Sequence, residues 1–168
     1  MRNIAVLLLA VTLLTGCVPI RRVTGGPSIM EMLRQTEQEV GVPLIVSGPV
    51  TQPDGSQIAV YRYQKGNQCG DGYILTRPGS GGGGGRGEGP CGNHGVTIGT
   101  GSNGTTTVLN GRLDAPGVAR VVVITPDGKE MDGIIGSGVW WLTLPGRVEG
   151  RFGVKALDSD GKVVAEAP

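Results

Sequence analysis

The chain has 168 residues, in which 15 lysines and arginines stand against 14 aspartates and glutamates. This near-balance gives a formal net charge of +1 and leaves no basic surface for electrostatic binding to nucleic acid or to anionic lipid. The length favours a single domain, and 32 glycines beside one Phe, three Tyr and two Trp leave few large side chains for its core.

The first segment along the chain is a short apolar run, residues 4–14, that follows Arg2. A basic start, an apolar stretch and small residues before a cleavage point together predict a secretory signal peptide over residues 1–16. The run is shorter than the roughly twenty apolar residues that a membrane-spanning helix needs. The alternative is a plain secretion signal with an incidental cysteine at position 17.

Residues 14–17, Leu-Thr-Gly-Cys, resemble the lipobox of bacterial lipoproteins. The resemblance implies that Cys17 is lipidated, that the bond before it is cut, and that the new amino terminus is acylated. Because two or more acyl chains anchor a protein stably, we expect it to be held to the cell membrane or outer membrane, facing the extracytoplasmic side. Val18 stands where an inner-membrane lipoprotein commonly has Asp, which favours the outer membrane.

Residues 17–27 mix proline, glycine and charge without periodicity and predict a tether, which leaves residues 28–168 as one domain. Ser28 and Glu31 form a capping-box pattern that predicts the start of a short helix, and Gly41 predicts its end. Its apolar positions fall near one face: Ile29, Leu33 and Val40. This face could lie on the membrane or bind a partner, but packing on its own domain is the preferred interpretation.

From Leu44 onward the apolar period becomes strand-like. Candidate strands are Leu44–Val50, Gln57–Tyr63, Tyr73–Thr76, Val96–Ile98, Thr105–Arg112, Val118–Thr125, Gly138–Leu144, Arg151–Leu157 and Lys162–Ala165. Short strands separated by Asp-Gly and Pro-Gly turns indicate an all-β sandwich or barrel. We therefore predict a mainly β protein, an antiparallel β-sandwich fronted by one short helix.

Residues 78–90 interrupt the strands with a glycine-rich segment in which residues 81–85 are all glycine. A phosphate-binding glycine loop would need a preceding strand, a following helix and, for a P-loop, Gly-Lys-Ser/Thr, and the segment lacks these. It is therefore expected to be a flexible loop.

With Cys17 assigned to lipid, Cys69 and Cys91 remain as a pair that flanks the glycine-rich loop. Outside the cytoplasm two such cysteines favour a disulfide, which would stabilise the fold by about 3 kcal/mol. The alternative is a metal site in which His94, the single histidine, joins both cysteines. A fourth ligand lacks a matching motif, so we expect no metal and no cofactor.

Trp140 and Trp141 are neighbours on a predicted strand and must point to opposite faces. Trp140 shares its face with Leu142 and Leu144 and is the predicted core residue. Trp141 either packs under the helix or stands at the surface, where an aromatic side chain would form a possible binding surface.

Several turn and strand patterns between residues 57 and 166 have a familiar order. They are Val60-Tyr61-Arg62-Tyr63, Cys69, the glycine run, Cys91-Gly92, Val118 to Val121, Thr125-Pro126-Asp127-Gly128, Trp141 to Pro145 and Asp158 to Gly161. Together they resemble small exported β-domains of actinobacteria and related bacteria. The resemblance implies an immunoglobulin-like or related fold and carries no known activity.

No catalytic constellation stands out, because His94 is the one histidine base available and no Gly-x-Ser-x-Gly lies between a strand and a helix. We therefore expect a non-catalytic binding or structural module of the cell envelope, anchored by lipid, with an envelope protein as its possible partner. The alternative is an envelope enzyme or metal-binding protein that uses His94 with Cys69 and Cys91.

Overall fold

The structure, a computed structural model, describes residues 26–92 and 95–168, so Cys17 and His94 lie outside the described part of the chain. Its elements are α1 (Ile29–Val40), β1 (Ile45–Thr51), β2 (Gln57–Lys65), β3 (Gln68–Arg77), β4 (Ser80–Pro90), β5 (Gly99–Ser102), β6 (Thr106–Arg112), β7 (Arg120–Ile124), β8 (Glu130–Gly136), β9 (Val139–Pro145), β10 (Gly153–Leu157) and β11 (Val163–Ala167).

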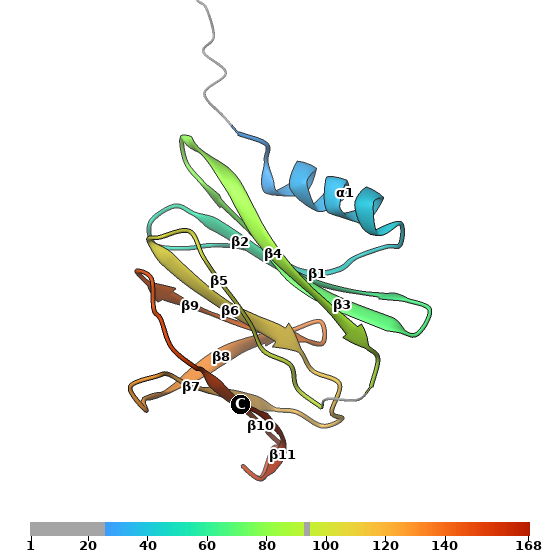
Figure 1. The fold of residues 1–168 in the computed structure, drawn as a ribbon, viewed down its shortest axis with the longest axis vertical. Coiled ribbons are helices and arrows are strands. Elements are labelled where there is room, and N and C mark those ends of the chain that lie inside the picture. Colours follow the sequence, from blue (N-terminus) through green and yellow to red (C-terminus); the bar gives the residue numbers. More distant parts are fainter. Residues whose placement is uncertain (1–25, 93–94) are drawn as a thin grey trace, which may run out of the picture.

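The strands form two antiparallel sheets. One has four strands in the order β1-β2-β3-β4, and the other has seven in the order β11-β10-β7-β8-β9-β6-β5. Strand β8 pairs through Glu130–Gly133 with β7 and through Ile134–Gly136 with β9, so it joins two halves of the larger sheet. Figure 1 shows α1, the four-stranded sheet and the two halves of the seven-stranded sheet one below another. The prediction of a mainly β, antiparallel sandwich with one short helix is confirmed.

The helix α1 begins and ends where the sequence predicts. The Ser28 backbone N–H donates to the Glu31 carboxylate at 2.7 Å, and the Glu31 N–H donates back to the Ser28 hydroxyl at 3.2 Å. Gly41 ends the helix in the left-handed region with φ of 77°, a conformation that glycine adopts without steric cost. The buried face of the helix packs on the outer face of the four-stranded sheet, as expected for packing on its own domain.

Strand β9 is covered on both of its faces. Trp140 is 0% exposed and belongs to the core between the two halves of the seven-stranded sheet, as predicted. Trp141 is 3% exposed and packs with Val139 and Val108 against the inner face of the four-stranded sheet. The expectation of a binding surface at Trp141 is therefore wrong, because a strand in a middle layer buries both tryptophans.

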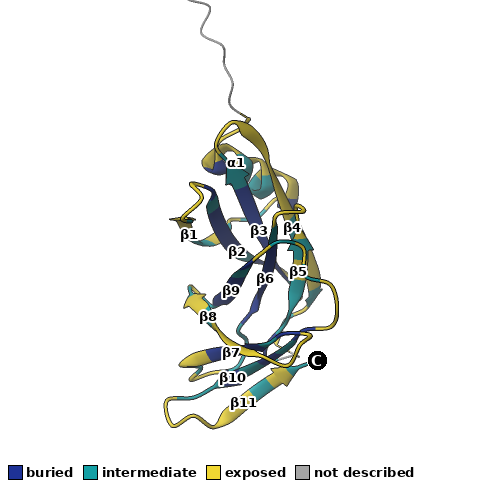
Figure 2. Cartoon of the chain, turned by 90° about the vertical axis from the view of Figure 1, so that its left-hand side faces the viewer, coloured by how far each residue is buried: buried dark blue, intermediate teal, exposed yellow. Residues whose placement is uncertain are grey.

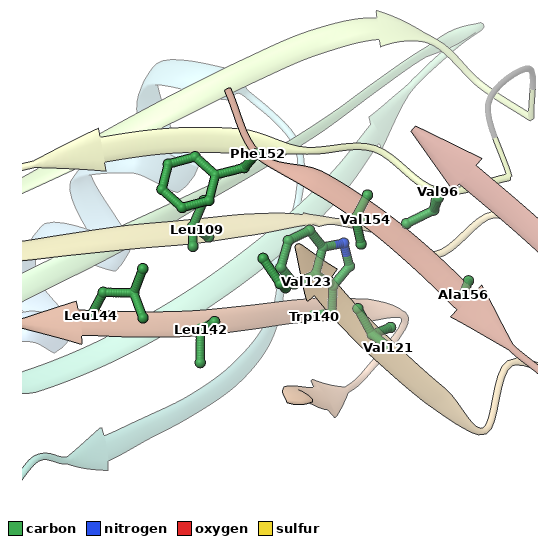
Figure 3. Packing of buried hydrophobic residues seen from close by; sticks show 10 residues of the cluster. All are labelled: Val96, Leu109, Val121, Val123, Trp140, Leu142, Leu144, Phe152, Val154 and Ala156. Atoms are coloured by element: carbon green, nitrogen blue, oxygen red, sulfur yellow. The ribbon is translucent and has the colours of Figure 1, made fainter. Parts of the chain in front are cut away.

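The larger core lies between β6 and β9 on one side and β7 and β10 on the other. Figure 3 shows Trp140 between Val121 and Val123 of β7, with Leu109 of β6 and Val154 of β10 close by. All five side chains are fully or almost fully buried. This cluster packs the two halves of the seven-stranded sheet against each other.

The glycine-rich segment is strand β4 and not the expected flexible loop. It pairs with β3 along its length, from Ser80 opposite Arg77 to Pro90 opposite Gln68. A Cβ added at Gly84 would lie 2.4 Å from the backbone oxygen of Tyr73. Such close approach leaves room only for glycine at position 84, and pairing with β3 makes the segment a strand.

Cys69 at the start of β3 and Cys91 just after β4 form the predicted disulfide, with Cα atoms 4.9 Å apart. The bond closes the open end of the β3–β4 hairpin. Among the described residues, no helix has the length and apolar character that crossing a membrane requires.

Candidate functional site

An unfilled space separates the two sheets at their β4 and β5 edges. Stacked sheets lie about 10 Å apart, and side chains normally fill the gap. Here a crevice of about 280 Å³ remains, which we call the inter-sheet crevice. It is lined by residues 85–89 of β4, residues 97–100 leading into β5, and Asp71, Tyr73, Asn110 and Arg112. Figure 2 shows that β4 is largely exposed, while the neighbouring strand β3 is buried.

Glycine backbone forms part of both walls of the crevice. A Cβ built at Gly87 or Gly89 would meet no described residue within 4 Å, and neither glycine has the positive φ that demands glycine. At Gly101 the same test gives the opposite answer, because a Cβ would lie 1.9 Å from the Tyr73 hydroxyl. Packing therefore explains Gly101, whereas Gly87 and Gly89 leave open space beside the strand.

The floor of the crevice is polar and buried. The register of β3 against β4 places Asp71 opposite Gly87, and the register of β6 against β5 places Asn110 opposite Gly99. The Asn110 side-chain amide donates to Asp71 Oδ2 at 2.9 Å, and the Thr97 hydroxyl lies 3.5 Å from Asp71 Oδ1. The whole Asp71 residue is 7% exposed.

Burial controls the charge state of Asp71. Removal from water raises its pKa to about 6, against the lowering effects of the Arg112 charge and the Thr97 hydrogen bond. The nearby Asp114 carboxylate adds to the increase. The group therefore changes charge closer to neutral pH than an exposed aspartate does.

Arg112 links the floor to the rest of the fold. It is 3% exposed, its Nη1 lies 3.8 Å from Asp71 Oδ1, and its Nε lies 3.5 Å from Asp114 Oδ2. Its guanidinium also donates to the backbone oxygen of Cys69, which places the disulfide next to this network. Buried charges of this kind persist when they have opposite partners, so the three groups form one coupled unit.

The outer face of β4 carries a separate ion pair. Arg86 Nε lies 3.6 Å from Glu88 Oε1, and the Tyr63 hydroxyl donates to the same carboxylate. Burial, with a further effect of Glu88, raises the pKa of Tyr63 above its usual value. The charges of Arg86 and Glu88 neutralise each other. Asp71 and Arg112 are therefore the charged groups of the crevice floor.

The structure separates the residues that the sequence singled out. Cys69 and Cys91 are bonded to each other, so they are not the two thiolates that the alternative metal site needs. Trp141 is in the core and does not line the crevice. Within residues 26–92 and 95–168, no three His, Cys, Asp or Glu side chains gather closely enough to hold a metal ion.

Three residues of the floor were not predicted: Asp71, Asn110 and Arg112. Two signals in the sequence could have found them. Asp71 stands between two glycines inside a strand, and Asn110 and Arg112 occupy alternate positions that share one face of β6. Polar residues on a face that should be buried are informative because burial demands partners for them.

Comparison of the chain with protein-family models, with curated proteins and with solved structures gave no match.

Proposed function

We propose that this protein is a lipid-anchored, non-catalytic binding module of the cell envelope and that its ligand occupies the inter-sheet crevice. The observation that carries the proposal is a crevice of about 280 Å³ with glycines in both walls and a buried polar floor. A sandwich that served only as a scaffold would gain stability from side chains in this space. Polar groups at the end of a concave site are what fixes the orientation of a ligand.

The floor is suited to holding a ligand rather than to transforming one. Asp71, Asn110 and Arg112 are fixed by strand register and by one another, so they form a rigid set of hydrogen-bonding groups. A rigid set of this kind recognises a ligand without a large ordering cost. Asp71, Asn110 and Arg112 belong to strands β3 and β6, which supports stable recognition.

The anchor in this proposal is Cys17, with residues 18–27 as the tether. The disulfide between Cys69 and Cys91 supports an oxidising compartment, since such bonds persist outside the cytoplasm. Replacement of Cys17 by Ala is expected to release the protein from the membrane fraction and to remove the acyl mass. Unchanged membrane retention of that variant would contradict the anchor.

The binding role is tested by placing a photo-cross-linking amino acid at Thr100, an exposed residue on the rim of the crevice. The matched control carries it at Lys129, which is exposed in the turn between β7 and β8. Irradiation of intact cells should give a reproducible product from position 100 and none from position 129. Equal products at both positions, or none at position 100 in folded protein, would count against the crevice as a binding site.

A further inference from the structure

We propose, on the basis of this binding role, that the inter-sheet crevice takes a primary ammonium group carried on an unbranched aliphatic stem. The ammonium would donate to Asp71, and the stem would lie between the backbones of β4 and β5. Two kinds of ligand carry such a group: a polypeptide with a lysine side chain, and a free alkylamine.

The shape of the crevice favours a slender ligand. Gly87 and Gly89 on one wall and Gly99 on the other present backbone and Cα atoms rather than side chains. An aliphatic stem can pack on such surfaces while its charged end reaches a polar group, as lysine stems do when they cover apolar surface. The volume of about 280 Å³ is enough for a stem of this kind.

The floor excludes an apolar ligand end. A hydrocarbon tip would cover Asp71 and Arg112 and offer them no hydrogen bond, which is costly for buried charged groups. The ligand must therefore end in a polar group. The net charge of the floor determines whether that group is a cation or an anion.

The buried charges select a cation. Two carboxylates, those of Asp71 and Asp114, lie on either side of the single guanidinium of Arg112, so the ionised set carries one excess negative charge. From the residues that the structure describes, Asp71 accepts one hydrogen bond of normal length, from Asn110, although a carboxylate has about four acceptor positions. An ammonium with three donors matches this spare capacity, whereas an anion would be repelled by it.

The other titratable groups near the crevice do not change the net charge of its floor. Arg86 and Glu88 pair with each other on the opposite face of β4. Tyr73 faces the crevice from β3, and burial raises the pKa of its hydroxyl, which therefore stays neutral near pH 7. Asp71 is the group in the crevice whose protonation controls cation binding.

The probes are n-butylammonium and acetyl-Gly-Lys-Gly-amide, and the matched neutral probe is acetyl-Gly-norleucine-Gly-amide. Binding is followed by NMR through the amide signals of Gly87 and Gly89 and the side-chain amide of Asn110. Both cationic probes should move these signals, and the norleucine peptide should not. Because Asp71 must be ionised, affinity should fall about tenfold between about pH 7.5 and about pH 5.

Two variants separate the site from the fold. Gly87→Val places a side chain directly opposite Asp71 in the β3–β4 register and should abolish binding. Gly83→Val is its control, since Gly83 lies on the same face of β4, has nothing within 4 Å of an added Cβ, and does not line the crevice. Asp71→Asn should weaken binding at least about tenfold, as expected for the loss of a charge-assisted hydrogen bond.

Equal binding of the lysine and norleucine peptides, or full binding to Gly87→Val, would overturn the proposal. If butylammonium binds as tightly as the lysine peptide, the source is a free amine, and a much tighter peptide indicates a polypeptide partner. Cross-linking at position 100 without any binding of the cationic probes would refute the ammonium while keeping the binding role. Failure of both experiments would refute both.

Discussion

The burial of Asp71 predicts that the contribution of this carboxyl group to stability falls as the pH rises. Its pKa is about 6 in the fold, whereas an aspartate in an unfolded chain titrates near 3.9. Between these values the native state binds more protons than the unfolded state, so the free energy of unfolding falls as the pH increases. A pKa difference of about 2 corresponds to on the order of 3 kcal/mol, present below about pH 4 and lost above about pH 6.

The assay is urea unfolding of the native sequence and of Asp71→Asn at several values between about pH 4 and about pH 7.5. Carboxylates distant from Asp71 titrate in the same range, but they are common to both proteins and cancel in the difference, whereas Asp114, which is coupled to Asp71 through Arg112, belongs to the measured effect. Asp54 and Asp127, whose pKa values are lowered by hydrogen bonds from Ser56 and from Lys129 respectively, belong to this common background.

As the pH rises through this window, the free energy of unfolding of Asp71→Asn should increase relative to that of the native sequence by on the order of 2 to 3 kcal/mol, which corresponds to the pKa difference above. A ligand ammonium at Asp71 should flatten the difference, because it stabilises the carboxylate. A difference in unfolding free energy that stays constant across the window would refute the assignment of a raised pKa to Asp71.

Three further predictions concern stability. Replacing Cys69 and Cys91 together by Ser should lower the free energy of unfolding by about 3.4 kcal/mol, from loop entropy at the observed sequence separation of 22, as measured by urea unfolding. Gly84→Ala should cost about 2 kcal/mol or more because its Cβ would clash with a backbone oxygen, while Gly83→Ala should be neutral or slightly stabilising. Equal melting temperatures for these two variants would contradict the packing account of β4. Trp141→Ala should cost about 3–5 kcal/mol and Trp141→Phe clearly less, since the indole nitrogen makes no hydrogen bond to the residues that the structure describes.

Local chemistry made part of the fold predictable. The capping box at Ser28, the stop at Gly41 and the core position of Trp140 depend on a few neighbouring residues and on the alternation of a strand. Each of these signals is read within one element. For that reason they hold without knowledge of how the sheets pack.

Strand β4 shows where such reasoning fails. Glycine has a low strand propensity, so the run from 81 to 85 predicts a loop. The strand forms by pairing with β3, and its packing partners favour glycine: the Tyr73 ring would lie 2.9 Å from a Cβ at Gly85, and the end of the Met32 side chain of α1 would have to move for one at Gly82. The tertiary contact overrides the local preference, and the sequence alone does not show which aromatic ring lies on which glycine.

The floor of the crevice was hidden for a related reason. Asp71 and Asn110 are 39 residues apart and meet only because β3 lies over β6 when the two sheets stack. Strand positions can be estimated from the sequence, but the order of the strands and the stacking of the sheets cannot. A site assembled across two sheets therefore becomes visible only in the fold.

The disulfide and the crevice are best understood together. Strands β4 and β5 bring glycine to the space between the sheets, so this edge forgoes the burial that core side chains would contribute. Loop entropy from the bond between Cys69 and Cys91 supplies about 3.4 kcal/mol, which is roughly what one or two buried aliphatic side chains would give. The disulfide thus offsets the stabilisation that buried side chains would otherwise contribute at this edge. It holds the ends of β3 and β4 together beside the crevice.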